Sequence, residues 1–351
     1  MLKKIVSCIL ISALLLVSSS GCSGFTEIPE LAADAIEISG NKVDNDYNNF
    51  LDIGGNLVRI DDKLYYNYEK NGRQYGTIEI SSAGSKRIFW MGANWLYPEI
   101  LPVIREYRGQ LLMFYKDEPR VYSAEKGEFI VDETLKAIPD FNENFFVGNS
   151  GIFYTQKAEY MADSPLYCYD GQETFVVFPE DLDRKSLYPA DDGIVFYSNT
   201  DDTVYKVLFD SLQVEEIASL TETETSHLLN GISFDYVMYN MAFFAFFSED
   251  MYNLCSCDLE TLEKKEIWTY SFKKEKPYFE CAYKPYNNSV FIASEVGIYR
   301  SDLLTEQTEK LSDAYGCQCY IVDDTWLYYV GKEAELWRIP QAGGEPELVY
   351  G

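Results

Sequence analysis

Histidine and basic residues are scarce in this sequence. The 351 residues include one histidine, and 29 Lys and Arg stand against 57 Asp and Glu, so the formal net charge is -28. A single histidine excludes a His-rich metal site and argues against catalysis by histidine. The acidic balance argues against docking on anionic lipid through a basic face and against nucleic acid, which needs clustered Lys and Arg. We therefore expect no nucleic-acid partner.

Long apolar runs and catalytic signatures are also missing after the N-terminus. The nearest candidate for a membrane span, Tyr236 to Phe247, is interrupted by Asn240 and is shorter than the roughly 20 residues that a bilayer requires. The chain contains no G-x-S-x-G, P-loop or dinucleotide fingerprint. The sequence therefore indicates no reaction, and we expect no cofactor and no bound metal.

The first residues have the features of an export signal. Lys3 and Lys4 precede an apolar run from Ile5 to Val17, and small residues follow as far as Gly21. A basic start, an apolar run of about 7–15 residues and a small-residue cleavage site form the secretory pattern. We therefore expect residues 1–21 to be a signal peptide.

Gly21-Cys22 resembles a bacterial lipobox, in which the Cys thiol carries a diacylglyceryl group and becomes the new N-terminus. Ser19 stands where that pattern prefers Leu, so the match is to its relaxed form. The resemblance implies that acylated Cys22 holds the protein in the lipid bilayer, on the extracytoplasmic face of the cell membrane. The alternative is an ordinary signal peptide with an incidental Cys. Residues 22–46 then form a lipid-anchored tether, and residues 47–351 form the folded domain.

One apolar-aromatic motif recurs through the folded domain, at intervals of roughly 36 to 50 residues. Polar turns rich in Asp and Asn precede several copies, and a second short strand with alternating polarity follows each of them. The seven copies are Leu64–Asn67, Leu112–Tyr115, Ile152–Thr155, Val195–Ser198, Ala245–Ser248, Phe291–Ser294 and Leu327–Val330.

This period corresponds to about four antiparallel strands, without visible helical periodicity. Four strands per repeat, seven repeats and no predicted helices indicate an all-β fold, a β-propeller of seven four-stranded blades. Hydrophobic residues at 47% are ample for a buried core. A ring is favoured because each small sheet buries its faces only against its neighbours. Six or eight blades are the alternatives, since residues 35–38 offer one additional strand.

Several repeats are similar to the YWTD-type repeats of low-density-lipoprotein-receptor-like domains and of exported bacterial proteins. The similarity rests on Leu64–Asn67, on Val195–Ser198, and on Leu336–Ile339 followed by Gly343-Gly344-Glu345-Pro346. Asn, Thr, Ser or Val replaces the Asp that follows the aromatic pair in the receptor repeats. The resemblance implies a propeller fold and a binding role, but it implies no reaction.

Six cysteines remain after the predicted anchor. Cys255 and Cys257 share one face of a predicted strand, as do Cys317 and Cys319, because alternate residues of a strand point the same way. We expect buried free thiols. A disulfide between Cys281 and the Cys317/Cys319 pair, made possible by export, and a thiolate metal site are the alternatives.

Acidic clusters raise the question of calcium. Asp44-Asn45-Asp46 resembles the start of an EF-hand loop, but Asn49 and Gly55 replace the Gly and Glu that such a loop requires. The doublets Asp61-Asp62, Asp191-Asp192 and Asp323-Asp324 recur at corresponding turns, which indicates turn chemistry rather than a metal site.

Loop lengths point to one end of the ring as the binding face. The turns between first and second strands are short, whereas several connections at the opposite end are long, and long loops on a rigid scaffold carry most binding residues. We predict ligand-binding residues in these loops: Trp95, Tyr97, Tyr160, Met161, Glu222 and Glu224. Aromatics beside carboxylates suit a carbohydrate or a cationic peptide; the alternative is that the aromatics cap the blades.

Three functional hypotheses remain. The first is a monomeric, lipid-anchored, non-catalytic binding or scaffold protein at the cell surface. The second is a secreted carbohydrate-active hydrolase or lyase that uses paired channel carboxylates, and the third is an assembly factor of an envelope complex. Because propellers serve all three classes, the fold does not choose among them, and catalysis is left open. A buried carboxylate pair favours the enzyme, and a large apolar rim patch favours assembly.

Overall fold

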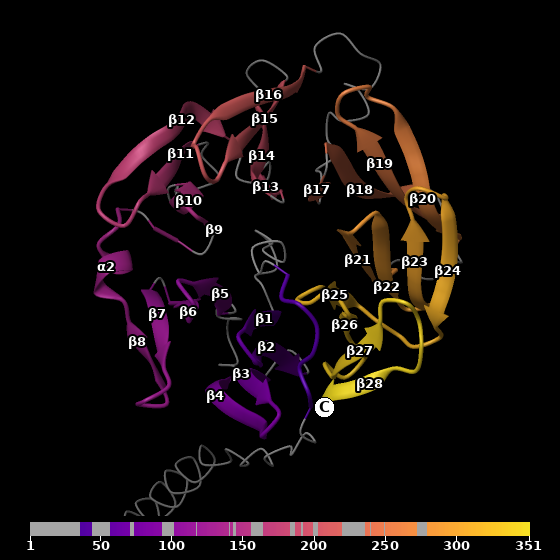
Figure 1. Ribbon diagram of the computed structural model, residues 1–351, viewed down its shortest axis with the longest axis horizontal. Coiled ribbons are helices and arrows are strands. Elements are labelled where there is room, and N and C mark those ends of the chain that lie inside the picture. The colour runs from indigo at the N-terminus through magenta and orange to yellow at the C-terminus, as the bar shows by residue number, and fades with distance from the viewer. Residues whose placement is uncertain are drawn as a thin grey trace, which may run out of the picture.

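A computed structural model of the chain shows strands arranged in a ring (Figure 1). It describes residues 36–43, 57–70, 74–92, 102–116, 118–139, 141–142, 145–155, 164–182, 187–190, 192–198, 203–219, 236–238, 240–248, 250–271 and 279–351. None of the helices in this described part has the length and hydrophobicity of a membrane-crossing helix.

Seven antiparallel sheets of four strands each make up the ring. Blade 1 contains β1 (Leu57–Ile60), β2 (Lys63–Lys70), β3 (Gln74–Ser81) and β4 (Gly84–Gly92), and blade 2 contains β5 (Val103–Tyr107), β6 (Gln110–Tyr115), β7 (Glu118–Ser123) and β8 (Glu128–Val131). Blade 3 contains β9 (Phe145–Gly148), β10 (Gly151–Thr155), β11 (Ser164–Tyr169) and β12 (Thr174–Leu182), and blade 4 contains β13 (Leu187–Pro189), β14 (Gly193–Ser198), β15 (Thr203–Leu208) and β16 (Val214–Ser219). Blade 5 contains β17 (Tyr236–Met238), β18 (Met241–Ser248), β19 (Met251–Asp258) and β20 (Lys264–Ser271), and blade 6 contains β21 (Cys281–Tyr286), β22 (Ser289–Ser294), β23 (Gly297–Asp302) and β24 (Gln307–Ser312). Blade 7 contains β25 (Gln318–Tyr320), β26 (Trp326–Val330), β27 (Leu336–Pro340) and β28 (Glu347–Tyr350), and the short helix α2 (Glu133–Lys136) follows blade 2.

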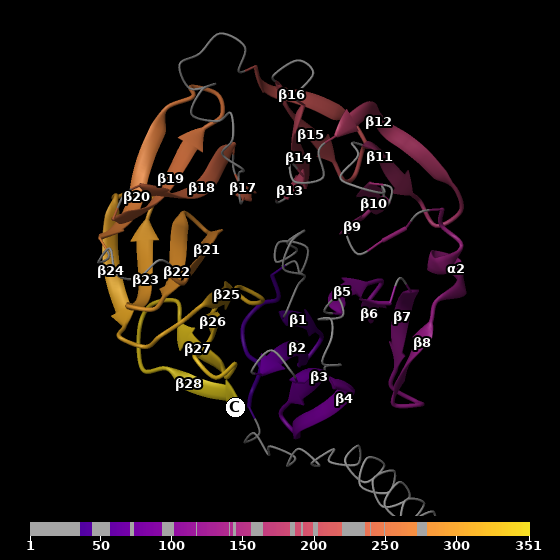
Figure 2. The ribbon, with the colours of Figure 1, turned by 180° about the vertical axis from the view of Figure 1, so that it is seen from behind.

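The predicted seven-bladed propeller is confirmed. The first strand of each blade lies nearest the axis and the fourth lies at the rim, in both views of the ring (Figures 1 and 2). Each of the seven sequence motifs falls on the second strand of its blade. The aromatic motif therefore lies on an interior strand of each sheet, which pairs with the first strand on one side and the third strand on the other.

The hydrophobic core is divided among the seven junctions between blades. Every core cluster draws its buried residues from two neighbouring blades, and the seven clusters together include the junction of blade 7 with blade 1. In blade 1, Leu64 packs toward blade 7 whereas Tyr65 packs toward blade 2, because successive side chains of a strand point to opposite faces. Ring closure thus supplies each small sheet with the cover that it lacks alone.

Strand direction gives the ring two distinct ends. The turns between first and second strands, such as Asp61-Asp62, share one end with the turns between third and fourth strands, and we call this the turn end. The connections between blades, such as residues 93–102 and 220–235, attach at the other end, the loop end.

Aspartates fix several of the outer turns at the turn end. The Oδ1 atoms of Asp170, Asp258 and Asp302 each accept hydrogen bonds from the backbone N–H groups two and three residues further on. These bonds hold the pKa of each carboxyl below its ordinary value. Such Asx turns replace missing ladder bonds and set the strand register of the hairpin.

Candidate functional site

The predicted anchor and ligand residues lie outside the described residues. Cys22 is in the N-terminal part, and the predicted ligand residues are Trp95, Tyr97, Tyr160, Met161, Glu222 and Glu224. The described strand ends show that their segments connect β4 to β5, β10 to β11 and β16 to β17, all at the loop end. These residues therefore remain predictions.

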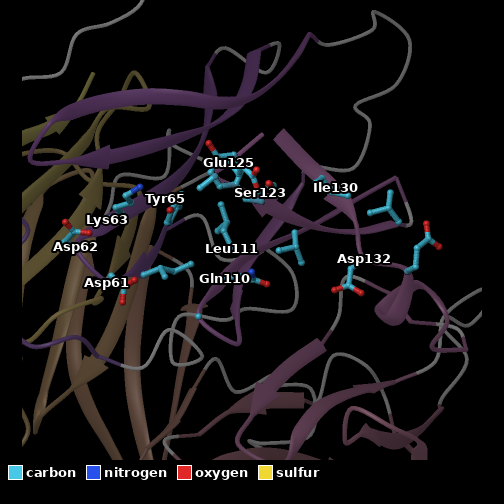
Figure 3. A pocket seen from close by; sticks show the side chains of 17 residues that line it. Asp61, Asp62, Lys63, Tyr65, Gln110, Leu111, Ser123, Glu125, Ile130 and Asp132 are labelled. Carbon is cyan, nitrogen blue, oxygen red and sulfur yellow. The ribbon is translucent and has the colours of Figure 1, made fainter. Parts of the chain in front are cut away.

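The described residues form a groove at the turn end of blades 1 and 2. The groove encloses about 690 Å³ and runs from the β1–β2 turn, across the β5–β6 turn, to β8 and the start of α2 (Figure 3). This volume is in the range that holds small ligands or a few residues of a peptide. The labelled side chains of Figure 3 come from both blades, so neither blade forms the groove alone.

Blade 1 supplies the first wall through its turn and β2. Asp61 has a φ of 53°, in the left-handed region that Asp tolerates better than most residues. Lys63 Nζ lies 3.1 Å from Glu79 Oε1, and Tyr65 Oη donates a hydrogen bond of 3.4 Å to Glu79 Oε2. Burial, with Glu79 nearby, raises the pKa of Tyr65, so its hydroxyl stays a neutral donor.

Blade 2 supplies the second wall. Arg108 and Gly109 both have positive φ values, 52° and 72°, as the tight turn of a two-residue hairpin requires. Tyr122 is buried under this wall, and its hydroxyl oxygen accepts a hydrogen bond of 3.4 Å from Lys86 Nζ of blade 1. At the far end, Asp132 caps α2 by accepting from the Thr134 N–H at 2.9 Å.

Negative charge dominates the groove. Five carboxylates line it, those of Asp61, Asp62, Glu125, Asp132 and Glu133, against the single ammonium of Lys63. That ammonium is already paired with Glu79, so it offsets little of the field. The groove therefore presents hydrogen-bond acceptors and a negative potential beside tyrosine rings, an arrangement that attracts cationic groups.

A buried carboxylate pair suited to acid–base catalysis is not formed by the residues that the structure describes. Asp323, at the turn of blade 7, is the fully buried carboxylate of that part of the chain. Its Oδ1 accepts from the N–H groups of Thr325 and Trp326 at 2.9 and 2.7 Å, and its Oδ2 accepts from the Tyr328 hydroxyl at 2.9 Å. Burial raises the pKa of Asp323, and these bonds partly offset the increase. The carboxylate is thus a structural part of the turn.

The six predicted thiols are free, and four of them are buried: Cys168, Cys255, Cys257 and Cys319. Burial raises the pKa of Cys168, Cys281 and Cys319 to about 12, which keeps them protonated at neutral pH. Thiols of this kind act as small apolar side chains in the core.

Three basic residues are buried in the inner strands, one of them Arg59 on β1. Arg105 lies on β5 and Lys284 on β21, and the Lys284 ammonium stands 4.6 Å from the centre of the Tyr236 ring. Burial lowers the pKa of Lys284; Cys319 opposes this shift, and Arg105 adds to it. The inner strands thus carry cationic side chains, whereas the groove at the turn end is acidic.

Some groove residues stand out in the sequence for another reason, and the others do not stand out at all. The doublet Asp61-Asp62 was interpreted as turn chemistry, but Gln110, Tyr122 and Glu125 carry no signal of their own. The strands of blade 2 position these three residues, and only the packing of blade 1 against blade 2 places them beside Asp61-Asp62. Aligning the seven repeats in register would have placed the β1–β2, β5–β6 and β7–β8 turns at the same end of the ring.

Comparison with known proteins adds similarity of fold alone. No protein-family model matches the chain, and no curated protein matches it in sequence. Among solved structures, the extracellular domain of BT4673 from B. thetaiotaomicron is 13% identical, with a TM-score of 0.47, over 90% of this chain and 44% of that one. The chain therefore spans less than half of the length of that protein.

Two further structures have similarly low scores. AztD from Citrobacter koseri is 12% identical with a TM-score of 0.44, over 84% of this chain and 86% of that one. A chain of the nidogen/laminin complex is 10% identical with a TM-score of 0.36, over 69% and 93%. The sheets themselves define the class of this protein, a seven-bladed β-propeller with four strands per blade.

Proposed function

We propose that this protein is an extracytoplasmic, lipid-anchored β-propeller that acts as a non-catalytic binding or scaffold protein at the cell surface. Acylated Cys22 is its contact with the bilayer, and the protein works as a monomer. The observation that carries the binding role is the groove at the turn end, in which carboxylates and tyrosines of two blades face one open volume. Such a groove on a rigid scaffold is a common place for a ligand.

The charge of the groove supports one ligand class over the other. Carbohydrate and peptide ligands both use aromatic side chains, but an excess of carboxylates favours a ligand with positive charge. A peptide rich in Lys or Arg supplies both that charge and an extended backbone. We therefore propose a basic peptide as the first ligand class and a carbohydrate as the second.

The alternatives have less support. For a carbohydrate-active hydrolase or lyase, the buried carboxylate in the described part, Asp323, is engaged by the turn of blade 7. For an assembly factor, the exposed apolar side chains of that part are spread over six blades instead of forming one patch. They are Ile130, Val176, Val214, Phe247, Met251, Leu304 and Leu348.

We further propose that the blades are related to YWTD-type repeats. The support is positional: the aromatic motif falls on the second strand of every blade, as an aromatic pair in all blades but blade 6, where Phe291 is the one aromatic of β22. Leu64 and Leu327 also have equivalent pairing in blades 1 and 7. A residue-by-residue alignment of these blades with YWTD blades tests the relation. Aromatic pairs at a different register on the second strand contradict it.

The binding role is tested with residues 23–351, a panel of glycans and short lysine-rich peptides. We expect a lysine-rich peptide to bind, and the triple change Asp61→Asn, Asp62→Asn and Glu125→Gln to weaken binding by about tenfold or more, since each close charge contributes up to about 1 kcal/mol. Glu263→Gln, at an exposed turn of blade 5, is the control and leaves the affinity unchanged. Raising the salt concentration weakens binding to the parent chain more than to the triple variant.

Two results contradict this assignment of the groove. One is equal weakening by Glu263→Gln. The other is binding that Trp95→Ala or Tyr97→Ala abolishes while the triple variant retains it, which moves the site to the loop end. Failure of every peptide and glycan to bind argues against the binding role itself.

The anchor is tested by labelled palmitate in cells that express the full-length chain. We expect label in the parent and in Cys8→Ala, whose cysteine lies inside the predicted signal peptide, but none in Cys22→Ala. Label retained by Cys22→Ala refutes the anchor.

A further inference from the structure

The first and last blades of the ring, blades 1 and 7, meet without sharing a strand among the described residues. Blade 7 contains β25–β28 and blade 1 contains β1–β4, and among the residues that the structure describes no strand from one end of the chain completes the sheet at the other. Residues 36–38, the segment considered as an additional strand, join no sheet. The first and last blades are therefore held together by side-chain packing and by any segment that contacts both of them.

Residues 36–43 are seated across this junction. Ile36 is buried in the core cluster that blades 7 and 1 share, and Val43 packs at the next junction, beside blades 6 and 7. Lys42 pairs with Asp323 in an isolated antiparallel bridge, and the Val43 N–H donates to the Val322 carbonyl at 3.1 Å. The segment thus runs along the turn of blade 7, with a bend at Gly40.

Asp324 and Asn41 fix the middle of the segment. The Asp324 carboxylate accepts from the Asn41 backbone N–H at 2.8 Å and from Asn41 Nδ2 at 2.7 Å. The Asp324 N–H in turn donates to the Asn41 carbonyl at 3.0 Å. Reciprocal bonds of this kind set the register of the segment on the turn as well as its distance.

Two arginines, one from each of the neighbouring blades 7 and 1, donate hydrogen bonds to the backbone of the segment. Arg338 of blade 7 donates to the Glu37 carbonyl at 2.8 Å. Arg59 of blade 1 donates to the carbonyls of Ser39 and Gly40 at 3.3 and 3.1 Å. The same segment is therefore bonded to the last blade and to the first.

The contacts extend to both walls of the groove. Arg59 Nε donates to the carbonyl of Asp61 at 3.2 Å, and Asp61 belongs to the β1–β2 turn that lines the groove. Lys42 Nζ lies 2.5 Å from Glu106 Oε2, and Glu106 is on β5, which leads into the second wall. One seated segment thus contacts blades 7, 1 and 2.

We propose that residues 36–43 form a clasp that closes the ring in place of an exchanged strand and positions the two walls of the groove. Arg59 is the positioning residue, because its guanidinium joins the clasp to the β1–β2 turn. The part of the proposal that concerns the groove rests on the proposed binding function. The closure of the ring does not depend on it.

Gly40 offers a sharp test, with Gly127 as its matched control. Both have positive φ values, 86° and 68°, so an alanine is strained at either position. A Cβ at Gly40 meets Thr325 Oγ1 at 2.6 Å and Asp324 Oδ1 at 2.8 Å, whereas a Cβ at Gly127 meets nothing within 4 Å. Gly40→Ala therefore disturbs the seat of the clasp, and Gly127→Ala reproduces only the backbone strain.

The experiment is hydrogen exchange on the full-length chain in detergent, without ligand. We expect the amides of Asn41, Val43 and Asp324 to exchange about tenfold faster or more in Gly40→Ala than in Gly127→Ala. The β1–β2 and β5–β6 turns, which line the groove, exchange faster as well, while β18 and β19 on the other side of the ring do not change. Asp324→Ala gives the same pattern, and Asp302→Ala, at an unrelated Asx turn, does not.

Equal exchange in Gly40→Ala and Gly127→Ala overturns the clasp. Faster exchange in the clasp without any change at the two groove turns overturns its role in positioning the groove. The result is independent of the binding role, because no ligand is present. It is also independent of the anchor, since residues 23–351 without lipid must show the same difference.

Discussion

Two neighbouring junctions of this ring are built on the same register, and they differ in what occupies them. In the junction of blades 7 and 1, residues 36–43 cover the turn end, whereas in the junction of blades 1 and 2 the corresponding place is the open groove. Tyr328 pairs with Arg338 across β26 and β27, and Tyr65 pairs with Glu79 across β2 and β3. The two sets of residues are therefore equivalent by position.

The two junctions differ in the charge of one side chain, which is Arg338 in blade 7 and Glu79 at the equivalent position of blade 1. Arg338 donates to the carbonyl of Glu37 and stacks on Trp326, with 4.1 Å between the guanidinium carbon and the ring centre. Glu79, its counterpart, has no proton to donate to a passing backbone carbonyl and instead accepts from Lys63 and Tyr65. A guanidinium therefore binds a backbone segment through its carbonyl groups, and a carboxylate leaves the junction open to a ligand that donates hydrogen bonds.

The largest expected difference between the junctions is at their turns. Asp323→Ala removes a buried carboxylate that accepts three hydrogen bonds and lies 3.8 Å from Arg59, so we expect it to lower the free energy of unfolding by about 3–5 kcal/mol. Asp62→Ala, in the exposed turn of the open junction, changes it by less than about 0.5 kcal/mol. Urea unfolding of both variants measures the difference. Similar losses in the two variants contradict a special role of the closed junction.

An intermediate effect is expected from the two equivalent positions. Arg338→Ala loses the bond to Glu37, the stacking on Trp326 and the pair with Glu347, which together amount to about 2 kcal/mol for a mostly buried guanidinium. Glu79→Ala loses the pair with Lys63 and one long hydrogen bond, about 1 kcal/mol or less. Denaturant unfolding under identical conditions compares them. A larger loss at Glu79 reverses the assigned order of the junctions.

Much of the ring was predictable from the sequence, because its pattern is local. Short apolar segments such as Leu254–Cys257 predict strands, and the recurrence of the aromatic strand predicts the number of blades. The half-buried pattern expected for Leu254–Cys257 is wrong, because all four of its residues are buried between blades. Asp323 was correctly interpreted as turn chemistry, since its Oδ1 accepts from the backbone of its own turn. Each of these inferences needs only residues that are near in the chain.

The clasp and the groove were not predictable, because they depend on contacts between residues that are far apart in the chain. Asn41 and Asp324 are 283 residues apart, and Ser39-Gly40-Asn41 has the composition of any linker. The segment was accordingly interpreted as part of the tether. The groove likewise depends on which turns of blades 1 and 2 become neighbours, a property of the closed ring. The six predicted ligand residues at the loop end stay predictions, because they lie outside the described residues.

The smallest expected effect is a dependence of stability on pH, and it arises from the pair of Asn41 and Asp324 in the closed junction. Hydrogen bonds from Asn41 hold the pKa of Asp324 below its ordinary value. A lowered pKa in the folded state means that this carboxylate stabilises the clasp above about pH 3.9, the ordinary value for Asp, and that the stabilisation is lost as the pH falls through the lowered pKa. Asn41→Ala removes the donors, so the parent and the variant differ in melting temperature at neutral pH and converge in acid. Calorimetry between about pH 2.5 and 7 measures the gap. A gap that is the same at every pH shows that Asn41 contributes by packing instead of through the Asp324 carboxylate.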